Sequence, residues 1–192
     1  MSTETFRKII FDQIRFANVA RIPKYVFEGS ESAAFFFCAW RHGRADVIQA
    51  YNNKTPHVHL IDRDEGKMDE MRLIYPPSWT YEVGDAFEVS KRMIREGENQ
   101  FDIVVCDPWA GQTPKILMES FRYFWPLSRR FYVAFVTVMD WFVPQGLEIK
   151  AQAVSAHLSK IHGEKIVVRD VVYRALGDRG GAYWLVIERP KE

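Results

Sequence analysis

From residue 33 onward, short apolar runs alternate with longer segments in which apolar residues recur at helical spacing. Residues 33–39 read AAFFFCA, a continuous apolar run that is typical of a strand buried on both faces. Strands alternating with helices indicate a parallel sheet covered by helices on both sides. The pattern predicts strands over residues 33–39, 58–61, 79–83, 101–106 and 131–138, and helices over residues 44–51, 65–75, 87–95, 114–124 and 145–161.

The end of the chain departs from this alternation. Two strand-like segments, residues 165–175 and 182–188, follow each other without a helix between them. The connecting residues 176–181 read LGDRGG, which favours a hairpin and therefore an antiparallel pair. The predicted fold class is α/β: a three-layer sandwich with a seven-stranded, mostly parallel sheet that ends in an antiparallel hairpin.

Composition and charge narrow the class of protein. The chain has 192 residues, which suits one compact domain, and residues 2–19 add an amphipathic helix before it. Lys and Arg number 26 against 25 Asp and Glu, so no broad basic surface for duplex nucleic acid is expected. Cys38 and Cys106 lie in apolar runs and are expected to be reduced core thiols. With no signal-peptide pattern and no apolar run of membrane-spanning length, we expect a cytoplasmic protein that does not enter the membrane.

Acidic side chains follow three of the predicted parallel strands. Asp62 follows the second strand, Asp85 the third and Asp107 the fourth. Because ligands of open parallel sheets bind outside the carboxyl ends of the strands, these acids are candidate site residues. An acid at the end of the second strand suits the two ribose hydroxyls of a nucleoside. The structural alternative is that Asp62 forms a turn in which Asp64 caps the next helix.

The element order and these strand ends resemble class I S-adenosylmethionine-dependent methyltransferases, which have a Rossmann-like fold. The resemblance implies S-adenosylmethionine as the cofactor and Asp62 as its ribose acceptor. Gly84-Asp85-Ala86 resembles the third motif of that family, in which the acid accepts from the adenine amino group and the next backbone N–H meets the ring. The alternative for Asp85 is an N-cap of the following helix, and both roles are compatible.

Asp107-Pro108-Trp109 resembles the fourth motif of the family, where the acid binds the target nitrogen and the aromatic ring stacks on the substrate. The match is partial, because amino-group methylating members have a second proline before the aromatic residue. Asp107 as a general base for an oxygen nucleophile and Asp107 as a structural residue stay open. His42 is a further candidate base, on its location in the first loop.

The first loop would face the methionine part of the cofactor, and Ala39, Trp40, Arg41 and Gly43 are the candidate residues there. The family has an acid and three alternating glycines, and only Gly43 matches that series, with Phe37 at the acidic position. Arg41 is a candidate partner for the cofactor carboxylate. The alternative function is a non-catalytic methyltransferase-like binding or scaffold domain that has lost cofactor binding. The few glycines also argue against a nicotinamide dehydrogenase.

The resemblance also bears on domains and partners. Residues 1–29 are expected to form a helical extension or lid, and residues 30–192 the methyltransferase-like domain. A small-molecule acceptor is the first expectation and a nucleobase the second, while a homo-oligomer stays open. We predict no metal site: Asp107 and Asp140 resemble two ligands of catechol-type enzymes, but Trp141 stands at the usual third position.

Overall fold

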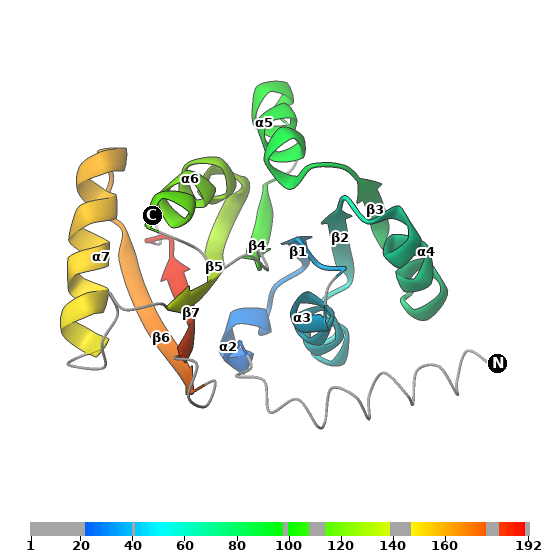
Figure 1. The fold of residues 1–192 in the computed structure, drawn as a ribbon, viewed down its shortest axis with the longest axis horizontal. Coiled ribbons are helices and arrows are strands. Elements are labelled where there is room, and N and C mark those ends of the chain that lie inside the picture. The colour runs from blue at the N-terminus through cyan, green and yellow to red at the C-terminus, as the bar shows by residue number, and fades with distance from the viewer. Residues whose placement is uncertain are drawn as a thin grey trace.

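The computed structural model describes residues 22–39, 41–97, 100–107, 114–138, 147–175 and 181–190. Within these ranges a central sheet is covered by helices on both faces (Figure 1). The predicted fold class is confirmed: seven strands form one sheet in the order β3-β2-β1-β4-β5-β7-β6. The strands are β1 (Ser32–Phe36), β2 (His57–Asp62), β3 (Thr80–Val83), β4 (Phe101–Cys106), β5 (Ser128–Val138), β6 (Val167–Ala175) and β7 (Gly181–Glu188).

The first five strands run parallel to one another, and the last two form the antiparallel hairpin. β1 lies between β2 and β4, and β7 pairs antiparallel with both β5 and β6. The chain reverses its direction of strand addition between β3 and β4, so β1 and β4 flank the point at which ligands of such sheets bind. The helices are α2 (Lys24–Phe27), α3 (Arg41–Asn52), α4 (Glu65–Ile74), α5 (Ala86–Glu96), α6 (Pro114–Phe124) and α7 (Leu147–His162).

Two hydrophobic clusters hold the layers together, one on each face of the sheet. On one face α2, α3 and α4 pack against strand residues such as Phe35, Leu60 and Val105. On the other face α5, α6 and α7 pack against Phe36, Val104 and their neighbours. Figure 1 shows α2 and α3 below the sheet and α5 and α6 above it. Successive residues of β1 and β4 enter opposite clusters, as the period of a strand requires, which explains why these strands are apolar throughout.

The first strand is shorter than its apolar run predicts. β1 ends at Phe36 instead of Ala39, because Phe37 has φ 64° in the left-handed region. A bulky residue rarely adopts that conformation, and it turns the chain out of the sheet. The next helix starts at Arg41, three residues before the predicted start. The segment expected as a loop is therefore a short turn followed by the first turn of α3.

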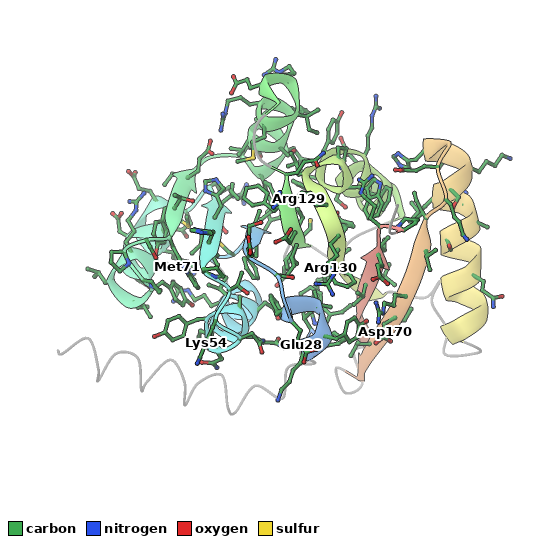
Figure 2. The ribbon with its side chains drawn as sticks, turned by 180° about the vertical axis from the view of Figure 1, so that it is seen from behind. Glu28, Lys54, Met71, Arg129, Arg130 and Asp170 are labelled. Atoms are coloured by element: carbon green, nitrogen blue, oxygen red, sulfur yellow. The ribbon has the colours of Figure 1, made fainter. Side chains whose placement is uncertain are left out.

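Two arginines at the start of β5 connect this strand to other parts of the chain. Figure 2 labels Arg129 and Arg130 at the start of β5 and Glu28 just after α2. Arg130 donates to the Glu28 carbonyl oxygen at 2.9 Å, and Arg129 pairs with Asp102 at 3.2 Å. Ile22, Val26 and Phe27 are buried in the same cluster as α3 and α4. The predicted helix over residues 2–19 and most of the hairpin connector, residues 176–180, lie outside the described residues.

Two further predictions concern the cysteines and the membrane. Cys38 and Cys106 are buried free thiols, as their apolar surroundings predicted. Burial raises the pKa of both thiols, so neither is a ready nucleophile. Among the helices of the described part of the chain, none has the length and apolar character needed to cross a membrane.

Candidate active site

Backbone hydrogen bonds draw the carboxyl ends of four strands together. The N–H of Phe37 donates to the Ile61 carbonyl at 3.0 Å, and the N–H of Asp107 donates to the Phe36 carbonyl at 3.2 Å. On the other side of β2, the N–H of Gly84 donates to the Asp62 carbonyl at 3.0 Å. The three acids predicted from strand ends therefore lie along one edge of the sheet.

Asp62 is buried and bonded to two backbone groups. Only 3% of the residue is exposed. Its Oδ2 accepts from the Ala39 N–H at 2.8 Å, and its Oδ1 accepts from the Asp64 N–H at 3.0 Å. The carboxylate thus ties the turn after β1 to the end of β2. Each carboxylate oxygen has a second lone pair, so these bonds leave capacity to accept from the hydroxyls of a ribose.

The capping role predicted for Asp64 as an alternative is present as well. Asp64 caps α4, accepting from the Lys67 N–H at 3.1 Å. Asp85 caps α5 in the same way, with Oδ1 accepting from the N–H groups of Phe87 and Glu88 at 3.0 and 3.2 Å. Both cap bonds use Oδ1 of Asp85, and the residue is exposed. A role of its other oxygen toward a ligand is compatible with the cap.

Replacing Asp85 separates these two roles. Asp85→Ala is expected to destabilise the protein by about 1 kcal/mol, because two N–H groups of α5 lose their acceptor. Asp85→Ser is expected to retain most of that stability, since a serine hydroxyl also caps helices. Denaturant unfolding measures both. Equal stability of the alanine and serine variants would contradict the capping role. A weaker affinity for a nucleoside in both variants would indicate the ligand role.

Asp107 directly follows β4 and has a buried carboxyl group. It is 4% exposed, and its Oδ2 has no hydrogen-bond partner among the described residues. Burial raises the pKa of Asp107 to about 7, because the charged form loses its hydration. A carboxyl group with a pKa close to neutrality at the end of a strand can take up or release a proton at physiological pH, as a general base requires.

The structure adds Asp46, which the sequence analysis missed. Asp46 lies on α3, is 1% exposed, and has an Oδ2 without a partner among the described residues. Its pKa is raised well above the usual value, first by burial and then by the nearby charge of Asp107. Asp46 is one helical turn before Ala50, which is also buried, so both residues lie on the inward face of α3.

Of the remaining predicted site residues, some lie in the described part of the chain and others lie outside it. Ala39 is fully buried, and Ala86 is 2% exposed at the start of α5. Arg41, His42 and Gly43 form the first turn of α3, where free backbone N–H groups of a helix are found. Trp40 and residues 108–113, including Trp109, lie outside the described residues, as do Asp140 and Trp141.

Phe37 occupies the position at which the methyltransferase motif has an acid. Its ring packs edge-on against Phe87 at 5.9 Å and Phe124 at 6.2 Å. These rings belong to the cluster on the α5 and α6 face. The side chain therefore serves the packing of the sheet and leaves no carboxylate at this point of the turn.

A pocket of about 320 Å³ lies at the opposite, amino-terminal edge of the sheet. It is lined by residues that begin strands, among them Ser32, His57 and Arg129. The Arg129 guanidinium is already paired with Asp102 and donates to the Ser32 hydroxyl. The positive charge of Arg129 is therefore already compensated and is not available to a ligand. Because ligands of open parallel sheets bind at the carboxyl ends of the strands, we place the candidate site at that edge. No three His, Cys, Asp or Glu side chains of the described residues form a group suited to a metal ion.

Comparisons with known proteins agree on the fold. No protein-family model and no curated protein matches the sequence. Among solved structures, an O-methyltransferase from Bacillus cereus in complex with S-adenosylhomocysteine is similar at TM-score 0.58 and 13% identity, covering 97% of this chain and 91% of that one. TrmK of M. capricolum in complex with S-adenosylhomocysteine matches at TM-score 0.57 and 11% identity, covering 87% and 67%.

An O-methyltransferase family protein from Burkholderia thailandensis matches at TM-score 0.55 and 12% identity, and this chain spans 58% of that protein's length. These similarities, together with the strand order and the terminal hairpin, define the fold. It is the Rossmann-like fold of S-adenosylmethionine-dependent methyltransferases.

Proposed function

We propose that the protein is an S-adenosylmethionine-dependent methyltransferase that acts on a small-molecule acceptor. When bound, this cofactor supplies an electrophilic methyl group on a sulfonium sulfur. The observation that carries the proposal is Asp107, a buried carboxyl group at the ligand-binding edge of a methyltransferase fold, with a pKa of about 7. A neighbouring acid that fits a ribose, Asp62, supports it.

The candidate residues form two groups, one for the cofactor and one for the methyl acceptor. Asp62 would accept from the ribose hydroxyls, and Asp85 with the Ala86 N–H would meet the adenine. The proposed contacts of the methionine end are Ala39, Trp40, Arg41 and Gly43. Asp107 orients the acceptor and takes its proton, with Trp109 and His42 as further candidates beside the acceptor. Much of the catalysis would come from holding the nucleophile in line with the methyl group while water is kept out.

A second function has its own support. Phe37 replaces the acid of the first motif and is committed to the core through Phe87 and Phe124. A binding or scaffold domain with the same fold and without methyl transfer would tolerate that change. Such a protein would not bind S-adenosylhomocysteine, whereas the enzyme would.

A structure determined with S-adenosylhomocysteine tests the proposal. We expect the ribose within hydrogen-bond distance of Asp62, the adenine beside Asp85 and the sulfur near the end of β4. A ligand bound elsewhere, such as in the pocket lined by Ser32 and Arg129, would contradict the assignment.

A further inference from the structure

The order of the acids along the edge gives a bound nucleoside a direction. The strand order β3-β2-β1-β4 places Asp85, then Asp62, then the turn after β1, and then Asp107. Neighbouring strands are about 4.8 Å apart, so the ends of β2 and β4 are about 10 Å apart. With its base at Asp85 and its ribose at Asp62, a nucleoside would direct its 5′ substituent across β1 toward Asp107 and α3. This inference rests on the proposed function.

Two acids near the carboxyl end of β4 have carboxylate oxygens without hydrogen-bond partners among the described residues. Asp46 and Asp107 each have a buried Oδ2 without a partner among the described residues, whereas both oxygens of Asp62 accept from backbone N–H groups. Arg44, a cation of α3 whose side chain the structure describes, pairs with Glu70 of α4 at 2.8 Å. The described surroundings of Asp46 therefore supply Asp107 as a charged neighbour and no cation.

Burying two carboxyl groups side by side is unfavourable unless a cation or a proton compensates them. The methionine end of S-adenosylmethionine carries an ammonium group, and the direction of the nucleoside brings that end to this place. We propose that Asp46, buried beside Asp107, is the carboxylate that binds the ammonium group of the cofactor. Asp46 would supply a carboxylate at this end of the edge, where Phe37 stands at the acidic position of the family's first motif.

Protons must move when the ammonium group arrives. Burial and the Asp107 charge raise the pKa of Asp46, so the pair holds a proton near neutral pH while no cation is bound. The ammonium group keeps its own protons and favours the ionised carboxylate. The carboxyl proton therefore passes to the solvent, and cofactor affinity increases as pH rises through neutrality.

Titration calorimetry with two ligands tests this. S-adenosylhomocysteine carries the amino-acid end, and 5′-methylthioadenosine is the same nucleoside thioether without it. At pH 7 in buffers of different ionisation enthalpy, we expect proton release with the first ligand and none with the second. Asp46→Asn is expected to weaken the binding of S-adenosylhomocysteine about tenfold or more, because the ammonium group loses a buried charged partner. It should change the affinity for 5′-methylthioadenosine by less than about twofold.

Asp69→Asn is the matched control, because it removes the same charge from an exposed pair with Arg72 on α4. It should leave both affinities unchanged. Equal losses for the two ligands in Asp46→Asn, or no proton release by the unmodified protein, overturn the role of Asp46. If neither ligand binds the unmodified protein, the proposed function fails, and this inference fails with it. If circular dichroism shows that Asp46→Asn is unfolded, the measurement of proton release by the unmodified protein decides the role of Asp46.

Discussion

Asp62→Ala is expected to abolish binding of S-adenosylhomocysteine and to lower the free energy of unfolding by about 2–6 kcal/mol. The Asp62 carboxylate accepts from the N–H groups of Ala39 and Asp64 at 2.8 and 3.0 Å, and only 3% of the residue is exposed. The variant would leave two donors of the site without their charged acceptor, at about 1–3 kcal/mol each. Urea unfolding gives the stability, and calorimetry gives the affinity.

Two controls separate binding from folding in this experiment. Asp62→Asn keeps the shape and one acceptor oxygen, so it should be more stable than Asp62→Ala and still bind the ribose poorly. Asp69→Asn removes an exposed acid from α4 and should match the unmodified protein in both measurements. An Asp62→Ala protein with unchanged stability and affinity would remove Asp62 from the site.

Asp107→Asn is expected to make the protein more stable at pH 8 and to change little near pH 4. Burial raises the pKa of Asp107 from 3.8 to about 7 in the folded protein. Between these pH values the folded state binds more protons than the unfolded state, so stability falls as pH rises. At about 1.4 kcal/mol for each pH unit the interval corresponds to about 4 kcal/mol, an upper bound for the gain at pH 8.

Unfolding by urea at pH 4, 6 and 8 measures this dependence for both proteins. The difference between the two proteins reports Asp107 together with its effect on Asp46, because the remaining titrating groups are common to both. Asp46 stays in place and its own pKa should decrease once the neighbouring charge is gone. A difference that does not vary with pH would contradict a buried, protonated Asp107. Once a methyl acceptor is identified, Asp107→Asn should still bind the cofactor and should lose methyltransferase activity.

The strands that face both clusters were predictable because burial on both faces leaves a continuous apolar run. β4 and α6 begin and end at the predicted residues, Phe101–Cys106 and Pro114–Phe124. The end of β1 was not predictable from hydrophobicity, since Phe37 is as apolar as the residues before it. Phe37 has a positive φ, and its ring contacts Phe87 and Phe124, which are far away in the sequence.

The candidate site was predictable where it follows strand ends. Asp62, Asp85 and Asp107 lie on one edge because parallel strands bring their carboxyl ends together. Asp46 was missed because it lies within a helix, where a single acid usually belongs to the solvated face. Only the packing of α3 against the sheet turns it inward.

The melting temperature with and without S-adenosylhomocysteine tests the central claim most directly. At a ligand concentration of about one hundred times its Kd, binding should stabilise the protein by about 2.7 kcal/mol. For a domain of this size that corresponds to an increase of roughly 5–10 °C. A nicotinamide dinucleotide at the same concentration should produce no increase. A folded protein whose melting temperature stays unchanged at millimolar S-adenosylhomocysteine would contradict a methyltransferase function for this site.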